Sequence, residues 1–254
     1  MNSMVVENLS IEFGGVRAVD NVSFVVEPGE TFAIIGPNGA GKSTIFNLIS
    51  RIYEPSSGSI HYGERDLLGV SAHRVVDLGI ARTFQNIDLF EQATVLQNLL
   101  VGRHSRMSRN LLRDFLFVAG ARAREREHRR KVEDIIDLRE IAHYRDQKIA
   151  DLPYGARKNV ELARALCSEP TLLLLDEPAS GLNQEETDDV SFWLDDIKHD
   201  LGVTIVMVEH DMGLVGRVAD RVMAINDGKL LSLGSVDEVR NDHAVQQAYL
   251  GTAS

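Results

Sequence analysis

A glycine-rich segment at residues 36–44, GPNGAGKST, contains the residue types that bind phosphate groups. It fits the pattern GxxxxGK[ST] and lies between the apolar run TFAII and an amphipathic stretch, which is the strand–loop–helix context that this pattern requires. Its glycines permit a tight turn whose N–H groups point at phosphate oxygens, and the helix N-terminus adds a positive dipole end. The segment predicts a phosphate site formed by Gly36, Pro37, Asn38, Gly39, Ala40, Gly41, Lys42, Ser43 and Thr44.

Three polar residues at the end of this segment have separate expected roles. Lys42 supplies a positive charge for the β- and γ-phosphates of a nucleotide. Ser43 offers a hydroxyl to Mg²⁺, and Thr44 reaches a phosphate. The alternative is a glycine-rich turn with a chance Lys-Ser pair, which the strand and helix on either side disfavour.

Two adjacent carboxylates end a second apolar run, in LLLLDEP at residues 172–178. We expect Asp176 to hold Mg²⁺ through water and Glu177 to polarise an attacking water as a general base. Alone, such a pair is also consistent with a strand end that caps a loop. Beside a phosphate loop it predicts hydrolysis of a nucleoside triphosphate.

Short apolar and β-branched runs provide the elements that must position these groups. Runs of this kind are typical of strands buried on both faces of a covered sheet. They predict strands at 22–26, 31–35, 171–175, 203–208 and 222–225. Amphipathic patterns predict helices at 42–52, 157–168, 184–199 and 212–219.

The middle and the end of the chain have a different character. From Thr94 to about Ile149 the chain is typical of helix and loop, which indicates a helical insertion. From Asn226 we expect a short hairpin, DGKLLSLG, followed by one helix. The predicted fold class is α/β: a P-loop NTPase core with a mixed sheet and an inserted helical subdomain.

Composition excludes several classes of protein. The net charge of −11 argues against a general nucleic-acid binder, which is normally basic. The single cysteine, Cys167, excludes an internal disulfide and fits a reducing compartment. We expect no signal peptide, and the apolar runs are far shorter than the ~18 residues that cross a bilayer. A role at a membrane therefore requires partner chains.

Taken together, these motifs resemble the ATP-binding subunit of ABC transporters over essentially the whole chain. The resemblance implies that Phe13 stacks on adenine, and that Gln85, in RTFQN, senses Mg²⁺ and the membrane partner. It also implies that ASGLN at 179–183 is the D-loop and that His210 contacts the γ-phosphate. Singly, Phe13 fits a core aromatic, Gln85 a surface loop residue and His210 a satisfied core histidine. Their joint spacing favours the family roles.

Within that family the chain is most similar to the ATP-binding subunits of branched-chain amino acid importers. The extended helical segment after VGRH also resembles that branch. Exporters of polar lipids or lipopolysaccharide share much of the pattern, so export of a lipid remains an alternative. The similarity is carried by FGGVRAVDNVSF (13–24), GIARTFQNIDLF (80–90), TVLQNLLVGRH (94–104), DEPASGLN (176–183) and VMVEHDM (206–212).

The segment LPYGA at 152–156 resembles the signature loop LSGGQ or LSYGQ, which in the family closes over ATP held by another subunit. Pro153 replaces the serine and Ala156 replaces the glutamine. Loss of a hydroxyl that binds charged phosphate costs roughly 1.5–3 kcal/mol, which is about one to two decades in rate. We expect an active enzyme with a variant loop; the alternative is a binding-only subunit. The loop residues are Leu152, Pro153, Tyr154, Gly155 and Ala156.

Two basic residues follow this loop, Arg157 and Lys158. We expect Arg157 or Lys158 to restore attraction to phosphate.

The resemblance also implies an organisation and a set of partners. The whole chain, 1–254, is one nucleotide-binding domain: an ATPase core at 1–86 and 165–225, a helical subdomain at 87–164 and an appendage at 226–254. ATP and Mg²⁺ are the expected ligands. Expected partners are a second ATP-binding subunit, identical or paralogous, separate transmembrane permease subunits and a solute-binding protein, with no nucleic acid. The expected location is the cytoplasmic face of the inner (plasma) membrane.

Other classes fit less well. A soluble ABC ATPase that acts on DNA or ribosomes would need tandem ATPase domains or long coiled arms. A GTPase would need an NKxD-type motif, and the sequence has none. A P-loop kinase would be indicated if the purified chain phosphorylated a small acceptor instead of releasing phosphate.

A basic stretch at 103–131 holds ten Arg or Lys residues against three acidic ones. It is consistent with a solvated helix or with a surface that faces anionic lipid or acidic loops of the membrane subunit.

Overall fold

The computed structural model describes residues 2–83, 87–106 and 118–250. Gln85 lies outside the described residues, as do the side chains of Arg122 and Arg124 in the basic stretch. The chain forms two compact units, one of residues Met1–Gln85 with Thr171–Ser254 and one of Asn86–Pro170. The division of the chain into domains that the sequence indicated, with junctions after residues 86, 164 and 225, stays a prediction.

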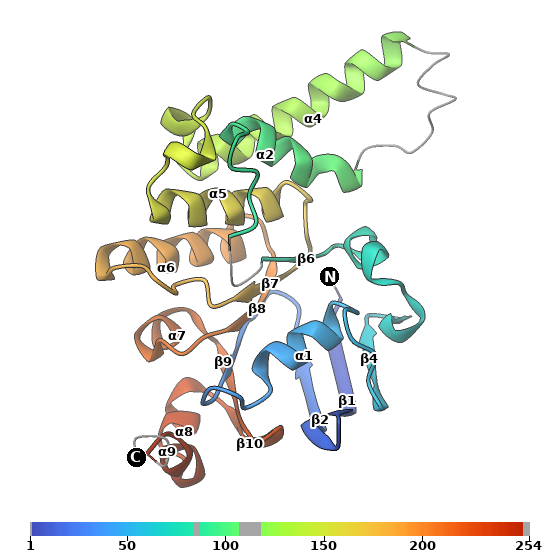
Figure 1. Cartoon of the computed structure of the whole chain (residues 1–254), viewed down its shortest axis with the longest axis vertical. Coiled ribbons are helices and arrows are strands. Elements are labelled where there is room, and N and C mark those ends of the chain that lie inside the picture. The colour runs from blue at the N-terminus through green and yellow to red at the C-terminus, as the bar shows by residue number, and fades with distance from the viewer. Residues whose placement is uncertain (1, 84–86, 107–117, 251–254) are drawn as a thin grey trace. The chain divides into compact units, whose positions relative to one another are not determined.

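The first unit contains two sheets (Figure 1). One is a four-stranded sheet in the order β2-β1-β4-β5, and the other is a six-stranded sheet in the order β10-β9-β3-β8-β7-β6. The strands are β1 Met4–Phe13, β2 Val16–Val26, β3 Thr31–Ile35, β4 Ser57–Tyr62, β5 Arg65–Asp66, β6 Ile80–Arg82, β7 Leu172–Asp176, β8 Thr204–Val208, β9 Arg221–Asn226 and β10 Lys229–Gly234.

The six-stranded sheet is mixed, as the sequence predicted. Strands β6, β7, β8, β3 and β9 pair in parallel, and β10 pairs antiparallel with β9. All five residues of β3, of β7 and of β8 are buried. These strands therefore have the continuous apolar runs expected of a covered parallel sheet.

One strand differs from the expectation of burial on both faces. The predicted strand 22–26 is the end of β2, which pairs antiparallel with β1 in the four-stranded sheet. Its burial alternates, with Val22 and Phe24 buried and Ser23 exposed between them. An antiparallel sheet commonly has one solvated face, which an apolar run of only five residues did not reveal.

A single apolar core joins the two sheets and helix α1, Lys42–Ile49. Phe24 from one sheet and Phe32 from the other stack with ring centroids 5.5 Å apart. The α1 residues Phe46 and Ile49 are fully buried in the same cluster. The remaining helices of this unit are α6 Gln184–His199, α7 Met212–Val218, α8 Val236–Arg240 and α9 His243–Leu250, with short 3₁₀ helices at Leu67–Gly69 and Ala72–Leu78.

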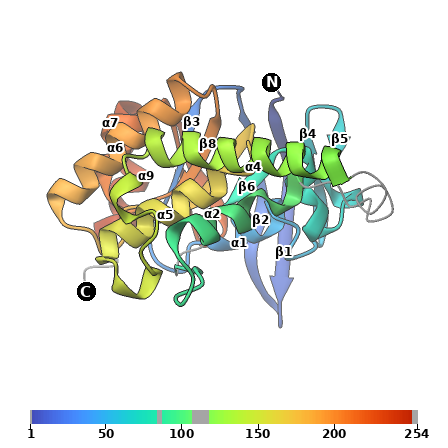
Figure 2. The same cartoon turned by 90° about the horizontal axis from the view of Figure 1, so that it is seen from above.

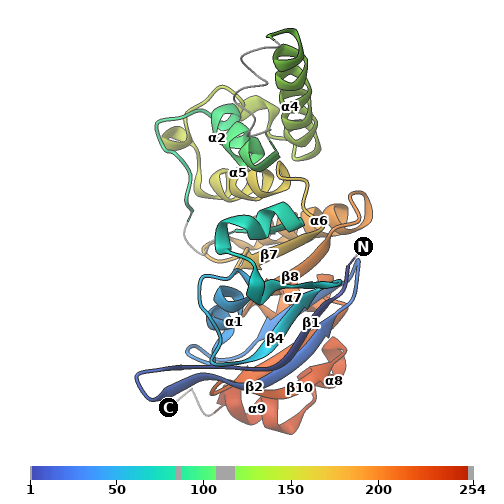
Figure 3. The same ribbon diagram turned by 90° about the vertical axis from the view of Figure 1, so that its right-hand side faces the viewer.

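The C-terminal segment contains two helices, whereas the sequence analysis expected one. Ser235 and Glu238 form a reciprocal capping box that begins α8. The Asp242 carboxylate then accepts N–H bonds from Ala244 and Val245, which starts α9. Asp242 is thus a second N-cap inside the predicted helix. Both helices pack on β10, and Figure 3 shows them beside it.

The second unit is helical in its described residues. Helices α2 and α5 pack on each other, and Figure 2 shows α4 running across both. Their apolar faces share a core that includes Leu99, Val132 and Val160. The elements are α2 Val95–Gly102, α4 Val118–Leu138, α5 Tyr154–Leu166, and 3₁₀ helices at Arg103–Arg106, Ala142–Tyr144 and Ile149–Asp151.

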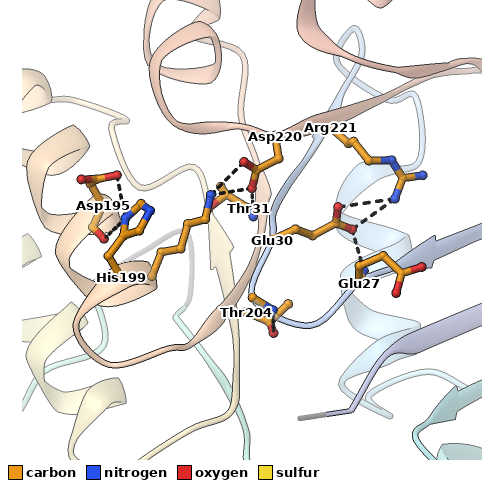
Figure 4. A network of polar contacts seen from close by, with 10 residues as sticks. Glu27, Glu30, Thr31, Asp195, His199, Thr204, Asp220 and Arg221 are labelled. Atoms are coloured by element: carbon orange, nitrogen blue, oxygen red, sulfur yellow. Dashed lines mark hydrogen bonds and ion pairs between the residues drawn. The ribbon is translucent and has the colours of Figure 1, made fainter.

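A polar network fixes the starts of β3 and β9, at the edge of the sheet opposite the loop 36–44 (Figure 4). The Asp220 carboxylate accepts the Thr31 N–H at 2.7 Å and two bonds from the Lys198 ammonium, at 2.7 and 2.8 Å. The Glu30 carboxylate pairs with Arg221 at 3.2 Å. Burial raises the pKa of Glu30, while the Glu27 N–H and Arg221 counter the rise.

A buried arginine at the end of α4 leads to a stability prediction. The Arg139 guanidinium donates twice to the Asn159 Oδ1, at 2.8 and 3.0 Å, and Asn159 donates back to the Arg139 carbonyl. Because Asn159→Ala removes the acceptor of two buried N–H groups, we expect it to lower the free energy of unfolding by about 1–3 kcal/mol. Urea denaturation measures this. Gln147→Ala, an exposed amide that also donates to a carbonyl, is the control, and equal losses for the two variants would contradict the prediction.

Candidate active site

Four segments meet at one edge of the six-stranded sheet because they follow the carboxyl ends of parallel neighbours. Loop 36–44 follows β3, Glu177 follows β7, His210 comes shortly after β8, and the turn at Gly228 follows β9. In sheets of this type, ligands bind outside the carboxyl ends of the strands. A hollow of about 240 Å³ lies here, lined by Ala18, Asn38, Gly39, Ala40, Gly41, Lys42, Ser43, Thr44 and Glu177.

Two glycines let the phosphate loop approach neighbouring backbone. A Cβ on Gly36 would lie 2.2 Å from the Ile225 carbonyl oxygen, and one on Gly41 would lie 2.4 Å from the Ala18 carbonyl oxygen. Both have positive φ, 154° and 103°, so only glycine fits without displacing the backbone. The Gly228 N–H donates to the Ala40 carbonyl at 3.0 Å and braces the loop from the β9–β10 turn.

Lys42 is held inside this loop. Its ammonium donates to the Gly36 and Pro37 carbonyls at 2.7 and 2.9 Å, and the residue is only 6% exposed. Burial lowers the pKa of Lys42, while the charges of Glu177 and Asp176 counter that shift. The first turn of α1 has no side-chain cap. Its N-terminal N–H groups therefore remain available to an anion beside the ammonium.

The two carboxylates face different partners. Asp176 is buried at the end of β7, and its Oδ2 accepts a bond from Arg82 at 3.0 Å. Arg82 also donates to Asn47 and Ser50 of the α1 segment, at 2.8 and 3.0 Å. Arg82 thus connects β6 and α1 to the end of β7.

Glu177 adopts a left-handed backbone conformation, with φ of 50°. Its N–H donates to the Val208 carbonyl at 2.9 Å, and its side chain lines the hollow. A non-glycine residue in this region costs of order 1 kcal/mol or more, and such strain is concentrated at functional sites. The turn directs the carboxylate toward the phosphate loop.

His210 lies beside Glu177. Its Nδ1 is 3.9 Å from Glu177 Oε2, and its side chain is 58% exposed. The next residue, Asp211, caps α7 by accepting the N–H groups of Gly213 and Leu214. His210 is therefore not a core histidine.

Phe13 is the last residue of β1 and is 45% exposed, so it is not a core aromatic. Its ring contacts Tyr53 edge-on, with centroids 5.2 Å apart and planes at 69°. This arrangement orients the Phe13 ring. The sequence analysis did not identify Tyr53, since nothing in its local pattern shows that it meets the β1–β2 hairpin.

The variant signature loop begins α5 within the second unit. Leu152 is buried, and Pro153 and Tyr154 are exposed. Pro153 is the N-cap residue, and this helix end has no side-chain cap.

The expectation that Arg157 or Lys158 adds attraction to phosphate stays a prediction. Lys158 is buried. The Arg157 guanidinium donates to the Leu152 and Ala150 carbonyls at 2.9 and 2.8 Å. Arg157 therefore holds the loop in shape with its charge directed into the loop's own carbonyls.

The sequence analysis missed further residues at the edge of the sheet. Arg82 belongs to the quoted segment GIARTFQNIDLF, three residues before Gln85, but its type alone did not indicate an Asp176 partner. Tyr249, from α9, receives a hydrogen bond from the Gly36 main chain; burial raises the pKa of its hydroxyl, and this bond counters part of the rise.

Among the described residues, no helix is both long enough and apolar enough to span a bilayer.

A phosphate loop after one buried strand and an Asp-Glu pair after another define a P-loop nucleotide-hydrolysing enzyme. The chain belongs to the ABC transporter family, whose model matches residues 19–180. A model of branched-chain amino acid ATP-binding cassette transporters matches residues 229–254.

Relatives and solved structures agree with this assignment. The chain is 36% identical over 248 residues to BraF, a high-affinity branched-chain amino acid transport ATP-binding protein of Pseudomonas aeruginosa, with 98% of this chain and 97% of the relative covered. LivG of Escherichia coli, with the same description, is 35% identical over 248 residues, at 98% and 97% coverage. The solved ADP conformation of MJ1267, an ATP-binding cassette of an ABC transporter, matches with a TM-score of 0.86 and 30% identity, covering 99% of both chains.

These comparisons confirm the predicted fold class, the family and the ATPase activity. The roles of the individual site residues stay predictions.

The close approach at Gly41 leads to a prediction about binding. Because a methyl group there would meet the Ala18 carbonyl, we expect Gly41→Ala to displace the loop and weaken ATP binding roughly tenfold or more. Titration with a fluorescent ATP analogue measures the dissociation constant. Gly29→Ala is the control, because Gly29 also has positive φ, +79°, yet its added Cβ meets nothing within 4 Å. Wild-type affinity in Gly41→Ala would contradict the prediction.

Proposed function

We propose that this chain is the ATP-hydrolysing subunit of a transporter that imports branched-chain or related amino acids. The observation that carries this proposal is the Glu177–His210 pair beside the phosphate hollow, in a chain whose relatives BraF and LivG are named for that transport. The match of residues 229–254 to a branched-chain amino acid cassette model favours amino-acid import over lipid export.

In this proposal the phosphates of ATP occupy the hollow. Lys42 and the N-terminal N–H groups of α1 hold the β- and γ-phosphates, with Thr44 beside them. The exposed Phe13 ring stacks on adenine. Glu177 accepts a proton from the attacking water as general base, and His210 contacts the γ-phosphate.

Mg²⁺ fits the residues present. Ser43 lines the hollow and Asp176 ends the neighbouring strand, and Mg²⁺ prefers oxygen ligands with few protein carboxylates. Ser43 and Asp176 would hold the ion, with Gln85 as a further ligand, and Arg82 fixes the orientation of the Asp176 carboxylate. Bound Mg²⁺ would neutralise charge on the phosphate oxygens.

We propose that a second ATP-binding subunit, identical or paralogous, completes each site with its own segment 152–156. The exposed Pro153 and Tyr154 and the uncapped start of α5 support this assignment, because helix N-termini favour anions. The Ala156 and Pro153 replacements remove side-chain donors but leave the helix terminus in place.

Separate transmembrane permease subunits are the proposed membrane partners, at the cytoplasmic face of the membrane, together with a solute-binding protein. A groove of about 620 Å³ in the second unit supports a docking role. Two apolar residues of its lining, Phe90 and Val101, are 59% and 49% exposed to solvent. Its lining is Phe90, Glu91, Gln92, Ala93, Gln97 and Val101.

One test of the proposed function concerns the ATP-dependent closure of two subunits. Glu177→Gln removes the general base, so the variant should keep ATP bound and form an ATP-dependent dimer, measured by light scattering after size exclusion. Lys42→Ala in the same background is the control and should stay monomeric. A monomer at saturating ATP would show that the variant signature loop does not close on a second copy, and adding a paralogous subunit would then test heteromeric pairing.

Another test of the proposed function concerns the transported solute. The tagged chain, purified in detergent with its membrane subunits and solute-binding protein and reconstituted in liposomes, should drive ATP-dependent uptake of labelled leucine. The Glu177→Gln complex should lose that uptake by about two orders of magnitude or more, as expected when a general base is lost. ATP-dependent movement of lipid without leucine uptake would support the lipid-export alternative instead.

A further inference from the structure

Glu209 is a buried carboxylate between the segments that carry Glu177 and His210. It is 0% exposed and directly follows β8. Its Oε1 accepts the Ala179 N–H at 2.9 Å. Its Oε2 accepts the His210 N–H at 2.9 Å and the Asp211 N–H at 3.2 Å. One side chain therefore holds main-chain groups of both segments.

The connection extends to the strand before the phosphate loop. The Glu209 N–H donates to the Ile34 carbonyl of β3 at 3.3 Å, two residues before Gly36. Glu209, which follows β8, thus contacts β3 and the segment that follows β7. Its side chain does not line the hollow. Besides the main-chain N–H groups that it accepts, its Oε2 lies 3.9 Å from His210 Nδ1, so the carboxylate acts on the site through the main chain and through the His210 ring.

Burying a carboxylate is unfavourable unless hydrogen bonds replace its hydration. Here three N–H groups donate to the carboxylate. Each of these hydrogen bonds is stronger than a hydrogen bond between neutral groups, because the acceptor is charged. The bonded groups lie two residues after Glu177 and at His210 itself. Holding these main-chain groups in place sets where the Glu177 and His210 side chains begin. His210 Nδ1 and Glu177 Oε2 lie 3.9 Å apart.

We propose that Glu209 is a positioning residue for ATP hydrolysis: by binding the Ala179, His210 and Asp211 N–H groups, it sets the geometry of the Glu177–His210 pair. The inference rests on the proposed function of Glu177 and His210. It assigns to Glu209 an effect on the chemical step and none on nucleotide binding.

Glu209→Gln tests this with almost no change in volume. A glutamine has one acceptor oxygen and one NH₂ group, so whichever way the amide turns, one of the two segments faces a donor in place of an acceptor. We expect kcat for phosphate release by the full-length chain to fall about 10- to 100-fold, with KM for ATP and the affinity for a non-hydrolysable ATP analogue within threefold of wild type.

The matched control is Glu30→Gln, at the opposite edge of the sheet. Glu30 is also a buried carboxylate that accepts a main-chain N–H, from Glu27 at 2.7 Å. It should leave kcat within twofold of wild type even where its melting temperature falls. Equal kcat for Glu209→Gln and wild type, or equal losses for the two Gln variants, would overturn the proposal.

A double-mutant cycle separates positioning from general destabilisation. If Glu209 acts by setting the geometry of the Glu177–His210 pair, adding Glu209→Gln to His210→Ala, which has no such pair, should lower single-turnover hydrolysis less than twofold further. A full additional loss in that background would overturn the proposal. If Glu209→Gln does not fold, Glu209→Asp, which keeps both oxygens on a shorter side chain, is measured against the same criteria.

Failure of the proposed function gives a different result. Absence of ATP hydrolysis in the wild type, or wild-type hydrolysis in Glu177→Gln, would refute the roles on which the inference rests. Loss of hydrolysis in Glu177→Gln with unchanged kcat in Glu209→Gln would refute the inference alone.

Discussion

The parallel register of β3, β8 and β7 is the constraint on which the rest of the structure depends. Ile34 lies opposite Val208, and Val208 opposite Asp176, so the three strands end at the same level. The phosphate loop, Glu177 and Glu209 all follow those ends directly. Residues far apart in sequence are adjacent because each strand is buried on both faces and has no other stable position.

In that arrangement several charged side chains are buried, and each of them is hydrogen-bonded to a specific partner. Lys42 donates to loop carbonyls, Asp176 accepts from Arg82, and Glu209 accepts three N–H groups. A buried charge without such partners would cost more than the fold can supply. The same bonds that make burial possible also hold the site in one geometry before ATP arrives. Such preorganisation is what electrostatic catalysis requires.

The C-terminal segment takes part in the same site. Gly228, in the β9–β10 turn, donates to Ala40, and Tyr249 of α9 contacts the Gly36 main chain. Both contact the main chain of the phosphate loop. The appendage therefore supports the nucleotide site, although the sequence analysis treated it only as an addition to the core.

The sequence by itself determined the phosphate loop, the Asp-Glu pair, the buried strands β3, β7 and β8, and the positions of helices α1, α5, α6 and α7. These follow from local rules: glycines that permit a tight turn, continuous apolar runs for covered strands, and amphipathic patterns for helices. Only the tertiary structure decided which side of β2 is solvated, that Arg82 meets Asp176, that Tyr53 meets Phe13, and that Arg157 binds its own loop. The partner of a buried charge depends on which strands become neighbours, and side-chain types at distant positions do not encode that pairing locally. Glu209 shows this most clearly, since its neighbour His210 was recognised from the motif, whereas its bond to Ala179 exists only because β7 and β8 lie side by side.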